Sequence, residues 1–410
     1  MATGFERQSH DDCATPRPPG LPESTLKLSP AATEPVHFRD VGRLRRAGTK
    51  LAWGCAWCIR TMFGIASLIL LLALLAAIPL INFFVLGYLL DVEGRVARSG
   101  RLRDAFPLID LAPRLGSIAL GFWLWLWPLR LLSNVATDAA IIAPGGNAAM
   151  AMNLLRQAAA IGVAAHLCLA LARGGGLGCF FRPIKNARWL AAQWRSGAYW
   201  EHAERHVRDF VRALRIRHHL WLGVRGFAGA MCWLVVPTAL LASSDKTEGA
   251  SIIVTVIGGV LLVIVLSWVP FLQAHFAAEN RFAAHFQLRA VRQLYKNAPF
   301  SWLFTLLITL TLALPMYFFK IALPPQDAMW LETLVFIVMI YPVKVATGWA
   351  YHRAAVREKR AFFGFRWLSR LVMAPLLVLF VFLLFFTQFI GEHGKGVLFE
   401  HHVFLLPAPF

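Results

Sequence analysis

The sequence predicts an all-α polytopic membrane protein, a bundle of seven or eight transmembrane helices, from its composition and the arrangement of its apolar residues. Of the 410 residues, 58% are hydrophobic and only 15% are charged, whereas soluble domains carry about 25% charged residues. The apolar residues come in blocks of about 20, the length of helix that crosses the hydrocarbon core of a bilayer. A chain so poor in charge cannot cover two or three soluble domains, so a soluble multidomain protein is excluded.

Residues 1–50 predict a disordered N-terminal tail. They hold six prolines among Ser, Thr and charged residues, and they lack the apolar core of a signal peptide. Eight candidate spans follow, at about residues 61–90, 117–136, 153–172, 226–242, 251–276, 301–320, 332–351 and 371–390. The first is long and contains Pro79 and Asn82, so we expect it to be kinked, tilted or partly re-entrant.

The connecting loops alternate between basic and uncharged, which predicts the orientation of the spans. Loop 91–116 holds five Arg and loop 173–225 holds eleven Lys or Arg, whereas loop 137–150 between them holds none. Basic loops stay in the cytoplasm, and the same alternation in later loops predicts an external C-terminus. The protein is therefore expected in the cell (inner) membrane with its basic loops cytoplasmic.

One conflict concerns the N-terminus. The basic residues between Arg39 and Arg60 favour a cytoplasmic N-terminus, but eight spans with an external C-terminus would place it outside. Either segment 61–90 enters the membrane and returns, or candidate 153–172, interrupted by Arg156 and His166, does not span. We favour the first alternative.

A short pattern recurs after the first and fifth candidate spans. Glu93-Gly-Arg-Val-Ala97 and Glu279-Asn-Arg-Phe-Ala283 share the pattern E-x-R-h-A, where h is apolar, at an offset of 186 residues. It suggests two parallel four-helix pseudo-repeats, although basic loops can also resemble each other by composition alone. The chain would then comprise a first membrane half, 51–242, with a basic segment at 180–220, a second half, 243–390, and a short C-terminal tail, 391–410.

The basic segment contains the clearest amphipathic helix, at residues 200–217. An apolar stripe and a basic face run along it at helical spacing, and such a helix lies in the membrane interface with its guanidinium groups near lipid phosphates. Ordinary topology and anchoring would also explain it. The candidate residues for binding a lipid or a partner are Arg182, Lys185, Arg188, Arg205, Arg208, Arg212 and Arg215.

Two basic residues lie inside candidate spans and are candidates for a transport pathway. Lys344 follows Pro342 in the seventh span, and Arg156 lies in the third. Charged groups inside a membrane are costly and often functional, but Lys344 is near enough to the cytoplasmic end to extend toward the interface.

No catalytic, cofactor-binding or metal-binding constellation is recognisable. The sequence lacks HExxH and GxSxG patterns, and His202 and His206 on one helix face are too few ligands for zinc. Cys55-x2-Cys58 stands without a second pair, and free buried thiols explain the six cysteines. Because the basic residues fall between apolar spans, the charge of +19 points to a membrane rather than to nucleic acid.

The run Pro79-Leu-Ile-Asn82 with Gly87-Tyr88, followed by an Arg-rich loop, resembles a family of uncharacterised multi-pass membrane proteins of archaea and bacteria. Segments 181–186 and 221–227 are similar to planctomycete-type versions of that family. No activity is known for the family, so the resemblance implies membership of a membrane family and no site residue.

Three functions remain open. The leading expectation is a non-enzymatic scaffold or envelope-associated protein, which engages anionic lipid or a partner through its basic cytoplasmic face and could form homo-oligomers or bind another membrane protein. The alternatives are a transporter or permease that uses Lys344 and Arg156, and a lipid-modifying enzyme, which would have to work without a recognisable catalytic constellation.

Overall fold

A computed structural model describes residues 38–197, 199–243, 249–319, 329–390 and 394–407. The chain divides into two units, 1–55 and 56–410; the first contributes the beginning of α1, and the second holds everything described below. The elements are α1 (Phe38–Ala76), α2 (Asn82–Ser99), η1 (Leu102–Ala105), α3 (Ala112–Ile142), α4 (Asn147–Ala172), α5 (Leu177–Phe180), α6 (Pro183–Arg195), α7 (Tyr199–Leu214), α8 (Ile216–Leu241), α9 (Gly249–Leu266), α10 (Val269–Glu279), η2 (Phe282–Phe286), α11 (Leu288–Asn297), α12 (Pro299–Phe318), α13 (Met329–Val356), α14 (Phe363–Thr387) and η4 (Gly394–Phe399).

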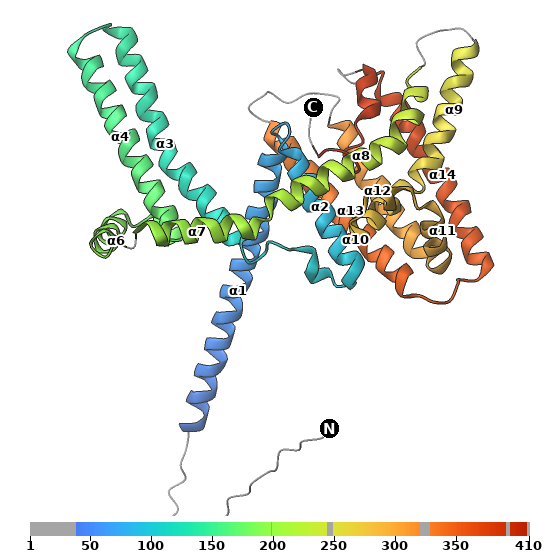
Figure 1. The fold of residues 1–410 in the computed structure, drawn as a ribbon, viewed down its shortest axis with the longest axis horizontal. Helices are drawn as coiled ribbons and strands as arrows, with labels where there is room; N and C mark the ends of the chain where they lie inside the picture. Colours follow the sequence, from blue (N-terminus) through green and yellow to red (C-terminus); the bar gives the residue numbers. More distant parts are fainter. Residues whose placement is uncertain (1–37, 198, 244–248, 320–328, 391–393, 408–410) are drawn as a thin grey trace, which may run out of the picture. The chain divides into compact units, whose positions relative to one another are not determined.

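The described residues form helices and no strands, and eight helical stretches are long and apolar enough to cross a membrane. Each overlaps one of the eight candidate spans predicted from the sequence, including the third, which corresponds to α4. The all-α polytopic fold is therefore confirmed. Most of the helices gather in one bundle, and the α3–α4 hairpin stands beside it (Figure 1).

The first candidate span is two helices rather than one. The chain turns at residues 77–81, where Leu80 has a positive φ of 68°, and α2 then runs back antiparallel to α1 (Figure 1). At the start of α3 the chain has returned to α1, since Pro113 is close-packed against Gly64. Segment 61–90 is thus a helical hairpin, and its entry into and return from the membrane stays a prediction.

The predicted tail 1–50 lies outside the described residues up to position 37. From Phe38 onward the chain is helical and belongs to α1. The last proline of the tail is Pro35, so no helix-breaking residue follows it in this stretch.

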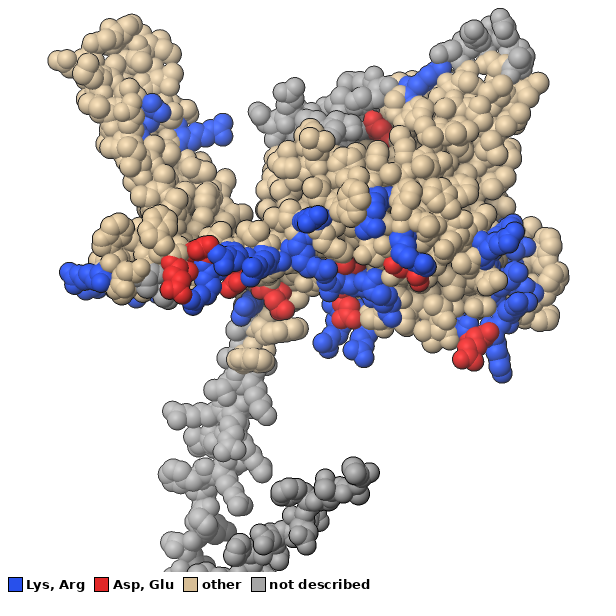
Figure 2. Space-filling view, viewed as in Figure 1, with Lys and Arg blue, Asp and Glu red and all other residues tan. Residues whose placement is uncertain are grey.

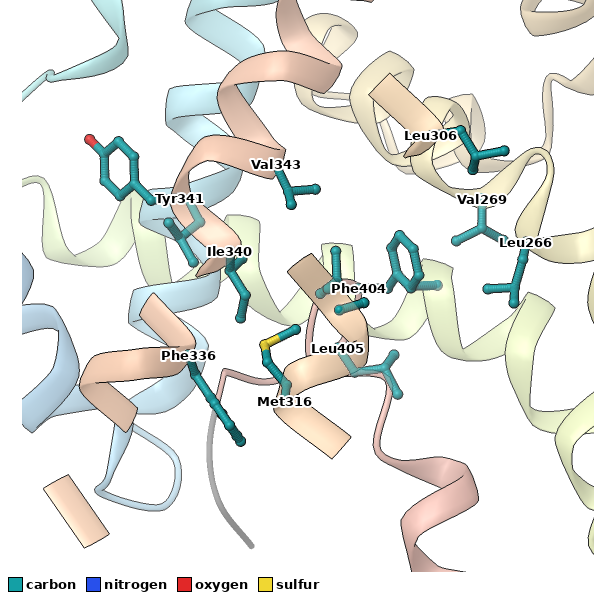
Figure 3. Close-up of a cluster of buried hydrophobic side chains, with 14 of the residues drawn as sticks. Leu266, Val269, Leu306, Met316, Phe336, Ile340, Tyr341, Val343, Phe404 and Leu405 are labelled. Carbon is teal, nitrogen blue, oxygen red and sulfur yellow. The ribbon is translucent and has the colours of Figure 1, made fainter. Parts of the chain in front are cut away.

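Buried side chains from both halves of the chain make one continuous core. In Figure 3, Leu266 and Val269 meet Leu306, while Phe336 and Ile340 of α13 lie near the C-terminal segment. Helices also approach closely where glycines remove side chains: a Cβ at Gly87 of α2 would overlap the carbonyl of His219 in α8. Such small-residue contacts drive helix association inside membranes.

The C-terminal segment, predicted as a tail, folds back into the bundle. Residues 394–407 are largely buried, and they contact several helices. His401 bonds Thr238 of α8 at 3.1 Å, and the carbonyl of Phe404 accepts a hydrogen bond from Gln273 of α10 at 2.6 Å. Apolar residues such as Leu398 and Leu405 give this segment its buried surface.

The ends of α2 and α10 have the same backbone geometry. Gly100 (φ 69°) directly follows α2 and Asn280 (φ 53°) directly follows α10; both are left-handed, the conformation that Gly and Asn adopt most readily at helix ends. Each is followed by an extended arginine, Arg101 or Arg281, and then by a 3-10 helix. The structural offset between the two copies is therefore 280 − 100 = 180 residues.

The offset of 186 predicted from the E-x-R-h-A pattern is not the one in the structure. That pattern would match Glu93, which is fully buried within α2, with Glu279, the exposed last residue of α10. The matching helix ends set the offset between the two halves at 180 residues. The residue of α10 that is equivalent to Glu93 is therefore Gln273.

The contacts between α2 and α10 are reciprocal in this register. Gly94 lies against the Ala277 carbonyl, and Ala97, the equivalent of Ala277, clusters with Ala274, the equivalent of Gly94. The resemblance between the two halves does not extend to the helix pairs that follow α2 and α10, namely α3–α4 and α12–α13. In α3 and α4, 17% of the most apolar window is buried, against 44% and 56% in α12 and α13. The two halves share their central helices and differ around them.

Candidate functional site

Helix α2 carries ionised side chains into the bundle. Of its 18 residues 13 are buried, among them Asp91 and Glu93. A buried carboxylate that lacks a partner costs several kcal/mol, so the partners of these two groups define the most polar part of the interior.

Glu93 pairs with Lys344 of α13. The Lys344 ammonium donates to Glu93 Oε2 at 3.2 Å and to Gln273 Oε1 at 2.5 Å. All three residues are almost completely buried, and Gln273 passes the chain of hydrogen bonds on to the Phe404 carbonyl. Glu93 Oε1 has no partner among the described residues.

The pair joins the two halves of the chain. Glu93 and Gln273 occupy equivalent positions in α2 and α10, and Lys344 bridges them from α13. Lys344 is therefore held by partners and does not extend to the interface.

Arg156, the other predicted pathway residue, lies on α4 and bonds Asn153 at 2.9 Å. No contact described here links Arg156 to Lys344. A pathway role for either stays a prediction.

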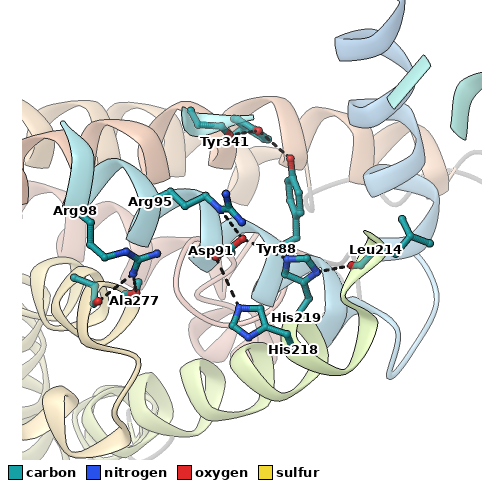
Figure 4. Close-up of polar contacts among 11 residues, drawn as sticks. Tyr88, Asp91, Arg95, Arg98, Leu214, His218, His219, Ala277 and Tyr341 are labelled. Atoms are coloured by element: carbon teal, nitrogen blue, oxygen red, sulfur yellow. Dashed lines mark hydrogen bonds and ion pairs between the residues drawn. The ribbon is translucent and has the colours of Figure 1, made fainter. Parts of the chain in front are cut away.

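Asp91, two residues before Glu93 in α2, is surrounded by basic side chains (Figure 4). Arg95 donates to Asp91 Oδ2 at 2.9 Å, and Nε2 of His219 lies 3.5 Å from the same oxygen. Because His219 Nδ1 donates to the Leu214 carbonyl at 3.0 Å, this histidine links α2 to the end of α7 as well as to α8. His218 approaches Asp91 at 3.8 Å.

Two buried tyrosines extend the network from α2 to α13. The Tyr341 hydroxyl donates to the Ala105 carbonyl at 2.7 Å, so Tyr88 donates to Tyr341 across 3.3 Å (Figure 4). Nearby, Arg98 donates to the carbonyls of Ala277 and Ala278 at 3.0 Å each, where the end of α10 carries partial negative charge. These contacts hold α2, α10 and α13 together.

Among the described residues no three His, Cys, Asp or Glu side chains gather as a metal site requires.

The basic residues predicted from the sequence lie together on the short helices between α4 and α8. α6 and α7 are amphipathic, and Figure 2 shows Lys and Arg gathered in a band at their level that continues below the bundle. Arg205 bonds Glu201 at 2.5 Å, and Arg208 bonds Glu204. All seven predicted residues are exposed: Arg182, Lys185, Arg188, Arg205, Arg208, Arg212 and Arg215.

A sharp bend at Arg215 separates α7 from α8. Arg215 has a left-handed backbone (φ 49°), so the amphipathic helix and the transmembrane helix take different directions. A groove of about 1200 Å³ lies at this bend. Arg212, Arg215, Arg217 and His218 line it together with apolar residues such as Trp221. We call it the elbow groove. Sequence reasoning identified Arg212 and Arg215 as candidate residues but could not show that they line a groove together with apolar residues.

Sequence reasoning also missed His285, which is buried where η2 meets α8 and α10. Its ring stacks on Phe276 with centroids 4.3 Å apart, and its carbonyl accepts from Trp233 Nε1 at 3.0 Å. Burial, and next the positive charge of Lys344, lower the pKa of His285 to about 3 from its ordinary value of 6.5.

This lowered pKa predicts a loss of stability in acid. The neutral imidazole stabilises the folded protein fully above pH 6.5, and this contribution falls as the pH falls toward 3, because the unfolded chain then binds the proton. Between pH 8 and pH 5 we expect His285 alone to lower the free energy of unfolding by about 2 kcal/mol. His285→Gln should weaken the pH dependence of thermal unfolding in detergent, whereas His206→Gln, an exposed residue on α7, should not. An unchanged dependence in His285→Gln would contradict the assignment.

No protein-family model, curated protein or solved structure matches this chain. Its resemblance to the uncharacterised family of membrane proteins stays a prediction.

Proposed function

We propose that this integral membrane protein is a non-enzymatic scaffold of the cell (inner) membrane that engages anionic lipids through α6, α7 and the elbow groove. The proposal places this basic face in the cytoplasm, in accord with the retention of basic loops on that side. Envelope components would be organised around the lipids or the partner bound there.

The observation that carries the proposal is the elbow groove. The guanidinium groups that line it suit phosphate oxygens, since charge-assisted hydrogen bonds to phosphate are strong. Ile216, Leu220 and Trp221, which also line it, suit the upper part of an acyl chain. A headgroup and its chain would thus meet matching surfaces in one place.

The exposed apolar residues of α7 support the same placement. Val207 and Val211 are 51% and 47% exposed on a helix that is otherwise rich in charge. A helix with this division lies in the interfacial plane with its apolar face in the acyl boundary. Arg114 of α3 stacks on Phe210 at 4.8 Å, which ties the helix to the transmembrane region.

Replacing Arg205, Arg208, Arg212 and Arg215 together by Gln should lower the preference for anionic lipid. Each basic residue near an anionic surface contributes about 1 kcal/mol. Arg205 and Arg208 also pair with glutamates, so we expect a loss of about tenfold rather than the full sum. The measurement is competition between phosphatidylglycerol and phosphatidylcholine for the purified protein, followed by native mass spectrometry.

A matched control removes four other exposed basic residues, Arg101, Arg103, Lys359 and Arg360, and so changes the net charge equally. The control should keep most of the preference, and raising the salt concentration should weaken the wild-type preference. Equal losses in both variants would mean that net charge, and not the α7 face, attracts the lipid. A preference that neither variant nor salt alters would end the proposal.

A further inference from the structure

The α9 and α14 helices enclose a second groove, remote in sequence from the basic face. Its wider part, about 610 Å³, is lined almost entirely by apolar side chains, among them Val256, Gly259 and Val381. A narrower hollow of about 240 Å³ continues it and shares Val263 and Ile264 with it. α9 has 18 residues and is therefore about 27 Å long, so the two parts together follow most of the depth of the hydrocarbon core.

The narrow hollow differs in chemistry from the wide part. Arg370 and Ser267 line it together with Trp268, Tyr295 and Trp302. Arg370 stacks over the Tyr295 ring at 5.4 Å and is exposed, so its guanidinium keeps free donors. This hollow lies at the end of the groove nearest α11 and the basic loops.

A neighbouring residue adds to this polar end. Arg292 of α11 stacks over Trp268 at 5.6 Å, which places a second guanidinium at the rim.

We propose that this groove binds one anionic glycerophospholipid, with its phosphate at Arg370 and an acyl chain along α9 and α14. The guanidiniums of Arg370 and Arg292 select a negative headgroup. The apolar wall beyond Ile264 accommodates the chain. This site is separate from the elbow groove and does not depend on the function proposed above.

The test titrates the purified full-length protein with phosphatidylglycerol and counts retained lipids by native mass spectrometry. We expect one tightly held phosphatidylglycerol in the wild type and at least fivefold weaker retention in Arg370→Gln. Arg353→Gln removes an arginine that stacks on Trp349 at 5.2 Å outside the groove; it should retain the lipid as the wild type does.

A second variant blocks the chain rather than the headgroup. Nothing lies within 3.4 Å of a Cβ at Gly259, so Gly259→Leu fills the groove without a backbone clash and should expel the lipid. Gly162→Leu, on a face of α4 with nothing within 4 Å, is its control. A phosphatidylglycerol carrying a photoreactive acyl chain should crosslink to α9 and α14.

Three results would overturn the proposal: retention unchanged in both Arg370→Gln and Gly259→Leu, equal retention of phosphatidylcholine, or crosslinks confined to other helices. The variant that replaces Arg205, Arg208, Arg212 and Arg215 by Gln separates the two proposals. This variant should still retain one phosphatidylglycerol in the groove between α9 and α14. If the variant lost that lipid, the retained lipid would belong to the basic face instead.

Discussion

Replacing Lys344 by Met is expected to lower the free energy of unfolding by about 3–5 kcal/mol. The change leaves the Glu93 carboxylate buried without its cation, and Gln273 loses its donor partner. Glu93 Oε1 has no partner among the described residues, so no other hydrogen bond described there would compensate for the loss of the one from Lys344. The measurement is unfolding of the purified protein in mixed micelles with increasing denaturing detergent.

The double variant Glu93→Gln with Lys344→Met provides the decisive comparison. It removes both charges and should recover a large part of the lost stability, since replacing a buried ion pair by neutral groups costs much less than breaking it. Lys359→Met, an exposed lysine, should leave stability unchanged. If Lys344→Met were as stable as the wild type, Lys344 and Glu93 could not form the buried pair described here.

Replacing Gly223 by Ala is expected to separate α2 from α8. A Cβ at this position would overlap the carbonyl of Phe83, and a backbone carbonyl inside a helix cannot move away alone. Overpacking of this kind costs about 1–3 kcal/mol or somewhat more, and we expect the upper end because Gly87 and Gly223 face each other. Thermal unfolding and protease accessibility of the 77–81 turn would report the change.

Gly162→Ala in α4 is the matched control. A Cβ there meets nothing within 4 Å, and alanine is the better helix former by about 1 kcal/mol, so this variant should be at least as stable as the wild type. Equal behaviour of the two alanine variants would show that α2 and α8 are not in close contact at Gly223.

The sequence predicted the strongly apolar helices and missed α2. Hydropathy and charge spacing identify a span when lipid or apolar side chains surround it. α2 is surrounded by other helices instead, so it can contain Asp91, Glu93 and Arg95. A scan that scores charge as a sign of a loop therefore placed the second half of this helix, residues 91–99, in a basic loop. Pro79, Asn82 and the conflict in the charge pattern were the signs of the turn before it.

The candidate site was predicted one residue at a time, without its pairs. Lys344 stood out because a cation inside an apolar span is costly, but nothing in the sequence connects it to Glu93, 251 positions away. The same holds for the register of the two halves. A five-residue pattern suggested one offset, and the left-handed residues that end α2 and α10, visible only as backbone angles, gave another.

The buried C-terminal segment has a consequence for biosynthesis. Residues 394–407 leave the ribosome after every transmembrane helix that they contact, yet their Phe404 carbonyl completes the hydrogen bonds of Gln273 beside Lys344. Until then the surfaces that Leu398 and Leu405 cover have no partner from this segment. A chain truncated before residue 394 would therefore leave the bundle incomplete beside Gln273 and Lys344.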